Sequence, residues 1–483
     1  MQLNLQLLNR NSQIALWLIL GSLAVSLSVA VLFQQFQWLL IAPALLVVIG
    51  CLLYTEQALL LSGAFAPLSI NQDNLMGGFG MSLPTEPVYI FLFGLLIFQW
   101  FKEGMPIDLK VLKHPIVLFV TAYGLWLWIS SVFSTMPLVS FKFTLARTWY
   151  IVLFFYFGIR IFKNYQRIHF YFGWFTAFIM GVVFYTLIEH SKDGFSRGSS
   201  YGISWPFFPD HGMYAAGIAW GVFVLVVYAF YVRQFGFNVA FGPVFLLLLL
   251  ILLFAVVVSF TRATWLSLIV AAGVWFITKL RIQFYWVLIA VFSILTVGII
   301  KQDEIMYSLE ANKQGSSDEL EGHVKSVSNI TTDPSNLERI NRWKCAGRMV
   351  AQRPIFGFGP GTYVFQYAPF QKSSELTLIS THAGDLGDAH SEYFSSMSET
   401  GFPGMFFWLG IVFSTVWISF RLIYTSKNFK HRLTTYIALT GLVAYYAHAV
   451  LNNYTQYDKL AVPFWAFTAV IVALDLKSKK QAL

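Results

Sequence analysis

Long apolar runs, separated by short polar turns, fill most of the chain. A helix that crosses a membrane needs ~20 mostly apolar residues, or somewhat fewer where flanking side chains reach back to the interface. The pattern therefore predicts an all-α, polytopic transmembrane helix bundle of about 12–14 spans. The candidate spans are 13–33, 37–54, 56–70, 87–101, 115–135, 143–162, 168–190, 211–232, 240–260, 263–279, 284–300, 391–421, 433–452 and 461–476. The 56–70 segment is short, so it is either a span or half of a broken helix.

One polar stretch, 301–389, is the only sizeable segment outside the predicted spans. It holds 9 Lys or Arg and 11 Asp or Glu, together 20 of the 55 charged residues (32 plus 23) of the chain, so it must be solvated. We therefore divide the chain into an N-terminal transmembrane bundle (1–300), a loop with an amphipathic helix (301–390) and C-terminal transmembrane helices (391–483).

The loop helix is expected to begin at Ser335-Asn336-Leu337-Glu338, which has the spacing of a capping box. It should end at Arg353-Pro354, because proline cannot continue a helix. Its basic residues are Arg339, Arg342, Lys344 and Arg348, and no acidic residue follows Glu338 within it. Such a helix is suited to a membrane surface or to an anion. The turn that follows, Phe356–Gly361, is rich in glycines that let backbone N–H groups crowd together.

Composition agrees with a membrane protein. The 483 residues are 57% hydrophobic and only 11% charged, whereas a soluble protein carries roughly 25% charged residues. No cleavable signal peptide is expected, because a polar start is followed by a full-length span. Cys51 lies in an apolar run and Cys345 in the polar loop, so no disulfide is expected between them.

The net charge of +9 is explained by topology, and no nucleic-acid partner is expected. If each span crosses once, the Lys- and Arg-rich turns fall on one side of the membrane, which the positive-inside rule makes the cytoplasm. Both termini are then cytoplasmic. The opposite side receives 71–86, 191–210, 261–262, 301–389 and 453–460.

Several arginines lie on this opposite face, against the usual bias. Arg262 is the clearest case, because it stands between two apolar runs with only Thr261 beside it, and a charge at membrane depth is costly and usually functional. It either binds lipid headgroups or grips a diphosphate together with Arg339, since guanidinium groups donate two hydrogen bonds to phosphate oxygens. Further candidates for the same role are Arg197, Arg342 and Arg348; for Arg197 a solvated loop is an equal alternative.

His390 stands where the polar loop meets the span 391–421, a boundary that can hold an imidazole neutral near pH 7 and ready to accept a proton. The alternative is a histidine that only bonds a neighbouring backbone group. Asp388 and Glu399 are nearby candidates; Glu399 either pairs with an arginine, orients the histidine or is a helix-terminus charge. The spacing of His382, Asp385, Asp388 and His390 matches no standard zinc pattern, so no metal site is expected.

The chain resembles the O-antigen ligase and polymerase superfamily over roughly residues 200–420. His390-Ser391, nine residues and then Gly401-Phe402-Pro403-Gly404 resemble its H-[NSQ]-x9-G-x-x-G signature. Arg339-x-x-x-Trp343 followed by the glycine-rich turn, and Arg262 at the end of a mid-chain span, resemble two further pieces of the pattern. The expected span count exceeds the usual twelve of this family.

The resemblance implies a GT-C-like, metal-independent and inverting glycosyltransferase of the bacterial inner membrane, with its active site at the periplasmic face. Its donor would be a glycan on undecaprenyl diphosphate, and its acceptor the lipid A-core or a growing glycan. Arg262 and Arg339 would bind the diphosphate, and His390 would be the general base. No cofactor is expected, because neither a Walker A motif nor a dinucleotide-binding fingerprint is present.

Three functions stay open at this point. A ligase moves a finished glycan to lipid A-core, a polymerase extends a lipid-linked chain, and a transporter moves the lipid-linked glycan without chemistry. The ligase is preferred narrowly over the polymerase, because both share the signature. The sequence leaves the sugar, the acceptor and the oligomeric state open.

Overall fold

The computed structural model describes residues 41–75, 79–104, 109–301, 334–377, 379–381 and 386–481, with Gly21 and Glu304 as single positions. Its first helices are α2 (Ile41–Leu53), α3 (Thr55–Phe65), α4 (Thr85–Glu103), α5 (Leu109–Leu112), α6 (Pro115–Val132), α7 (Pro137–Tyr150), α8 (Gly158–Ile161) and α9 (Tyr165–Lys192). The later ones are α10 (Arg197–Ser200), α11 (His211–Phe230), α12 (Phe241–Val258), α13 (Arg262–Lys279), α14 (Phe284–Ile300), α17 (Pro334–Gln352), α18 (Tyr363–Gln366), α19 (Glu392–Thr425), α20 (Phe429–His448) and α21 (Asp458–Gln481). The shorter turns are η3 (Ala66–Leu68), the π-helical η4 (Ile151–Phe157), η5 (Val232–Phe235), η6 (Ala368–Phe370) and η7 (Ser373–Glu375).

This architecture confirms an all-α, multi-pass membrane protein. By length and composition, 7 helices of the described residues can cross a membrane: Pro115–Val132, Pro137–Ile161, Tyr165–Lys192, His211–Phe230, Phe241–Val258, Glu392–Thr425 and Asp458–Lys479. The expected spans at 37–54, 56–70, 87–101, 263–279, 284–300 and 433–452 also correspond to helices, namely α2, α3, α4, α13, α14 and α20. The expected span 13–33 lies outside the described residues, Gly21 apart, and the division at 300 and 390 stays a prediction.

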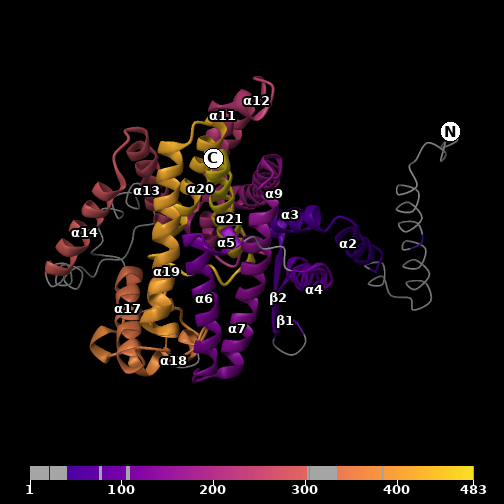
Figure 1. Cartoon of the computed structure of the whole chain (residues 1–483). Coiled ribbons are helices and arrows are strands. Elements are labelled where there is room, and N and C mark those ends of the chain that lie inside the picture. The colour runs from indigo at the N-terminus through magenta and orange to yellow at the C-terminus, as the bar shows by residue number, and fades with distance from the viewer. Residues whose placement is uncertain are drawn as a thin grey trace.

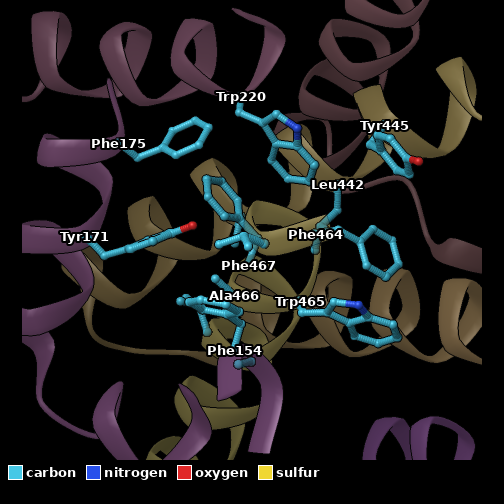
Figure 2. Close-up of a cluster of buried hydrophobic side chains, with 14 of the residues drawn as sticks. Phe154, Tyr171, Phe175, Trp220, Leu442, Tyr445, Phe464, Trp465, Ala466 and Phe467 are labelled. Atoms are coloured by element: carbon cyan, nitrogen blue, oxygen red, sulfur yellow. The ribbon is translucent and has the colours of Figure 1, made fainter. Parts of the chain in front are cut away.

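The bundle is packed around α21, which is buried along most of its length (Figure 2). Phe467 of α21 lies between Phe172 of α9 and Trp220 of α11, with ring centroids 4.6 and 4.7 Å away. Aromatic pairs of this kind contribute about 0.5–1.5 kcal/mol each beyond their buried area. Helices in a bilayer are held together by such close packing, because lipid tails are as apolar as the side chains.

A two-stranded antiparallel hairpin, β1 (Ile70–Leu75) with β2 (Phe79–Leu83), occupies most of the segment 71–86, which the predicted topology places on the face opposite the cytoplasm. It is joined to the start of α21 by a buried polar cluster. Asp458 accepts hydrogen bonds from Ser69 and Thr85 at 2.7 and 2.6 Å, and Lys459 donates to Asn71 at 2.8 Å. In Figure 1 this hairpin lies at the same end of the bundle as α17 and α18.

The glycine-rich turn at 357–361 docks backbone to backbone on a kink in α19. Phe358 and Gly359 donate their N–H groups to the carbonyl oxygens of Ser398 and Glu399 at 3.0 and 2.8 Å. The kink is at Gly401, whose φ of +70° is left-handed, and a Cβ there would lie 2.1 Å from the carbonyl oxygen of Ile355. The N–H groups of Phe358 and Gly359 are therefore used for packing rather than for an anion.

The loop helix α17 also packs on the bundle. It ends at Gln352, as the proline predicted, and it begins at Pro334. Its buried side includes Asn341, Arg342 and Met349, and Trp343 stacks on Phe394 of α19 with ring centroids 5.1 Å apart. The helix is thus fixed against α19 through this contact. The side chain of Ser335 is outside the described residues, so the capping box stays a prediction.

Candidate functional site

A cavity of about 750 Å³ opens at the end of the bundle that carries α17. Its walls come from the N-termini of α11 and α13, from α17, from the segment before α19 and from the α20–α21 connection. The predicted site residues that line it are Arg197, Arg262, Arg339, Asp388 and His390. This volume is typical of a site for an organic ligand. The fold thus brings together residues that are widely separated in the chain.

Arg262 is the first residue of α13, at the α12–α13 connection. Its guanidinium is half-buried and stands at the positive end of the α13 helix dipole, which favours an anion. Arg339 and Arg197 are close enough to repel it electrostatically. A bound phosphate group would remove this repulsion, so the three arginines favour a ligand with more than one negative charge.

Arg339 connects α17 to the α20–α21 connection. Its Nε donates to the carbonyl oxygen of Leu451 at 3.3 Å, and one terminal nitrogen donates to Asn336 at 3.5 Å. Burial lowers the pKa of the Arg339 guanidinium from its usual value, although an arginine stays charged at neutral pH. A buried cation of this kind binds an anion strongly, because little water competes for it.

His390 lies directly before α19 and has a left-handed backbone, with φ of +50°. The next two residues are anchored to α20: Glu392 N donates to the carbonyl oxygen of Ala449 at 2.9 Å, and the Ser391 hydroxyl donates to the same oxygen at 3.4 Å. Burial, and then the charges of Arg339 and Arg342, lower the pKa of His390 to about 4. The imidazole is therefore neutral at pH 7 and can accept a proton.

Asp388 lines the same cavity and is held there by hydrogen bonds. Its Oδ1 accepts hydrogen bonds from Asn453 Nδ2 at 2.6 Å and from the Ala389 N–H at 2.7 Å. Burial raises the pKa of Asp388 to about 6. Arg342 does not line the cavity; it donates to the Asp388 carbonyl oxygen at 2.9 Å and pairs with Glu338 at 2.6 Å. Arg342 is thus placed to position the segment before His390.

Two predicted candidates lie away from the cavity. Arg348 pairs with Glu375 and donates to the Phe370 carbonyl oxygen at 2.5 Å, which holds the loop after α18. Glu399 is buried and accepts a hydrogen bond from the Tyr363 N–H at 3.1 Å. Arg348 thus holds the segment 370–375 against α17, and Glu399 holds the start of α18 against α19.

The prediction of no metal site stays a prediction. Within the part of the chain that the structure describes, no three His, Cys, Asp or Glu side chains are grouped as metal ligands would be. His382 and Asp385 lie outside that part.

The sequence did not single out a large share of the cavity wall. These residues lie in two segments, 200–213 and 451–457, and are Ser200, Tyr201, Asp210, His211, Gly212, Met213, Leu451, Asn452, Asn453, Tyr454, Gln456 and Tyr457. The predicted topology could have pointed to these two segments. Both segments flank connections that we placed on the same face as His390, and Asn452–Gln456 is a polar run between two apolar spans.

Comparison with known proteins gives one finding on the family. The sequence model of a family described as O-antigen ligase matches residues 245–409. That range contains Arg262, Arg339 and His390, whereas the 200–213 and 451–457 walls of the cavity lie outside it. No curated protein matches the chain.

Proposed function

The chain is a member of the O-antigen ligase and polymerase superfamily by its match over residues 245–409, and from this premise we propose that it is an inverting, metal-independent glycosyltransferase. It moves a glycan from undecaprenyl diphosphate to an acceptor hydroxyl, with lipid A-core as the acceptor. It acts in the bacterial inner membrane, with both termini cytoplasmic and the cavity at the periplasmic face. The observation that carries the proposal is the meeting of Arg262, Arg339 and His390 in one cavity.

The arginines supply the site for the leaving group. A diphosphate fits beside Arg262 and Arg339, with Arg197 as a third cation on the same wall. As the bond between the anomeric carbon and the diphosphate oxygen breaks, negative charge grows on that oxygen. Guanidinium groups that are already in place stabilise this charge more than the charge of the ground state, which lowers the barrier.

His390 supplies the base. Its neutral imidazole accepts the proton of the acceptor hydroxyl while the hydroxyl oxygen attacks the anomeric carbon from the face opposite the diphosphate. One carbon–oxygen bond forms, another breaks, the configuration inverts and undecaprenyl diphosphate leaves. The bound diphosphate also neutralises the arginines beside His390, so it should raise the pKa of the imidazole and make it a stronger base.

A transfer assay with purified protein in proteoliposomes tests the proposal. The substrates are the host's lipid-linked glycan and lipid A-core, with EDTA present. The wild type should form a glycan–core product of inverted configuration, and His390→Ala should form none while remaining folded. Arg262→Lys should also be badly impaired, because an ammonium cannot make the forked contact with phosphate. Arg233→Lys, an exposed arginine after α11, is the matched control.

The products decide between the remaining alternatives. Transfer onto a lipid-linked glycan instead of lipid A-core would show that the enzyme is a polymerase and not a ligase. Vesicle transport without any new glycosidic bond, unaffected by the His390 and Arg262 substitutions, would contradict the enzyme and favour a transporter.

A further inference from the structure

The cavity is larger than a diphosphate needs. Next to the arginines, its wall is formed by aromatic, carboxylate and amide side chains. Tyr454 lies close enough to Arg339 to be influenced by its charge, and its hydroxyl donates to Asp210 Oδ1 at 3.1 Å. This contact joins the α20–α21 connection to the start of α11. Tyr201 in turn lies within the electrostatic reach of Arg262. Tyr454 and Tyr201 thus lie next to the two arginines proposed to bind the diphosphate.

Asp210 has one carboxylate oxygen to spare for a ligand. Both of its side-chain hydrogen bonds within the described residues go to Oδ1, from the Met213 N–H at 2.9 Å and from the Tyr454 hydroxyl. These two bonds fix the orientation of the carboxylate at the cavity wall, while Oδ2 keeps its capacity to accept. A fixed carboxylate oxygen is a strong acceptor for a hydroxyl group.

Gln456 offers the complementary groups. Its side chain is half-buried on the cavity wall, and its amide makes no hydrogen bond with any other described residue. The amide can donate two hydrogen bonds and accept others. An amide and a carboxylate that line the same cavity can together bind the hydroxyl groups of a sugar, because each hydroxyl both donates and accepts.

Tyr201 provides an apolar surface in the same wall. Its ring is 55% exposed and lines the cavity, and the His211 ring meets it edge-on with centroids 4.5 Å apart. A tyrosine ring held in this way presents a flat face at low entropic cost. The apolar C–H face of a pyranose ring can lie against such a surface.

We propose that Tyr201, Asp210 and Gln456 form a sugar subsite that binds the glycan residue attached to the diphosphate, an inference that rests on the proposed function. The charged groups of the cavity favour different parts of the donor. The arginines attract the diphosphate, whereas the Asp210 carboxylate repels it and accepts hydroxyl groups instead. A donor bound with its diphosphate at Arg262 and Arg339 therefore places its first sugar at the subsite.

The subsite also lies outside the part of the chain that matches the family. Arg262, Arg339 and His390 fall within 245–409, while Tyr201, Asp210 and Gln456 do not. The residues proposed for bond breaking and those proposed for sugar recognition thus come from different segments. Substitutions in the subsite should change which donor is accepted and how tightly, without removing the diphosphate site.

Binding of two lipids tests this assignment. The probes are undecaprenyl diphosphate carrying the host glycan and bare undecaprenyl diphosphate, titrated against the full-length protein in nanodiscs. Gln456→Leu keeps the side-chain size but removes the amide, so it should weaken binding of the glycan-bearing lipid about tenfold and leave the bare lipid within about twofold. Asp210→Asn should act in the same direction. Gln283→Leu, an exposed glutamine before α14, is the matched control.

The outcomes separate this inference from the proposed function. Arg262→Gln should weaken binding of both lipids, which marks the diphosphate site independently. A wild-type protein that binds the bare lipid, together with Gln456→Leu and Asp210→Asn variants that bind the glycan-bearing lipid as well as the wild type, would overturn the subsite alone. The subsite would also be overturned if its variants lost binding of the bare lipid and of the glycan-bearing lipid equally. A wild-type protein that binds neither lipid would overturn the proposed function and the subsite with it.

Discussion

Asn453 Nδ2 donates a hydrogen bond to Asp388 Oδ1 at 2.6 Å, which joins the α20–α21 connection to the segment that carries His390. Asn453 is buried, Asp388 is half-buried, and both line the cavity. The same connection contacts Arg339 through the Leu451 carbonyl oxygen and Glu392 through Thr455, whose hydroxyl donates at 2.6 Å. The connection therefore sets the relative positions of the proposed diphosphate site and the proposed base.

Asn453→Leu should slow transfer without greatly weakening donor binding. The substitution removes the side-chain donor of the half-buried Asp388 carboxylate, and a small displacement of a catalytic group can cost up to about a hundredfold in rate. We expect kcat to fall between about tenfold and a hundredfold while the donor KM stays within about twofold, since the arginines are untouched. Steady-state transfer kinetics measure both parameters.

Asn238→Leu is the control for that experiment. It also removes one side-chain hydrogen bond, which Asn238 Oδ1 accepts from the Ala240 N–H, but Asn238 lies outside the cavity. Its kinetics should match those of the wild type. If Asn453→Leu raised KM and left kcat unchanged, Asn453 would be a binding group and the positioning role would be wrong.

Gly401→Ala should destabilise the protein and abolish transfer. Gly401 has a φ of +70°, and an added Cβ would meet the backbone of Ile355 at 2.1 Å, so the loop segment could no longer dock on α19. With φ of +70° and ψ of −174°, the backbone of Gly401 lies in a region that is essentially open to glycine only, which costs any other residue about 1–3 kcal/mol. The measurement is the midpoint of thermal denaturation in detergent, alongside the transfer rate.

Gly347→Ala is the matched control, because Gly347 lies inside α17 and nothing stands within 4 Å of its added Cβ. There alanine should be neutral or stabilise the helix by up to about 1 kcal/mol. A Gly401→Ala protein that melted and worked like Gly347→Ala would show that the kink is not required.

The sequence predicted the helical elements well, because length and apolar character determine spans almost by themselves. It also identified Arg262, Arg339 and His390 as candidates that the fold then brings into one cavity. Their position against the usual charge bias was an independent signal. The resemblance added the order of these residues along the chain.

The roles of the other basic residues were harder to predict. In the sequence, Arg342 and Arg348 are equivalent to Arg339, because all three lie on a mostly basic helix. In the structure, Arg342 pairs with Glu338 and Arg348 pairs with Glu375. The Glu338–Arg342 spacing of four residues carried that information, whereas Glu375 lies beyond the end of α17. Contacts between distant segments, such as those of Asn453, depend on tertiary packing and leave no local pattern.

Arg342→Ala should be far more damaging than removal of the whole ion pair. Arg342 and Glu338 are only 2% and 4% exposed, and without Arg342 the buried Glu338 carboxylate keeps only the Thr377 and Ser380 hydroxyls as hydrogen-bond donors among the described residues. Breaking a buried ion pair by removing one partner costs about 3–5 kcal/mol. We expect Arg342→Ala to lower the thermal midpoint strongly and the double variant Glu338→Ala/Arg342→Ala to recover part of the loss. Denaturation of the two single variants and the double variant completes a cycle. Additive losses would mean that the pair is not coupled.

Donor binding should raise the pKa of His390. Burial and the charges of Arg339 and Arg342 hold that pKa at about 4. Undecaprenyl diphosphate brings negative charge next to Arg339, which weakens the repulsion of the imidazolium and favours protonation. Side-chain NMR of ¹⁵N-histidine-labelled protein in nanodiscs, with His390→Gln to assign the signal, should show the titration moving to higher pH when the bare lipid is added. In an Arg339→Gln protein the free pKa should already be higher and the shift smaller. A titration that did not move with the lipid would mean that the diphosphate does not bind beside His390.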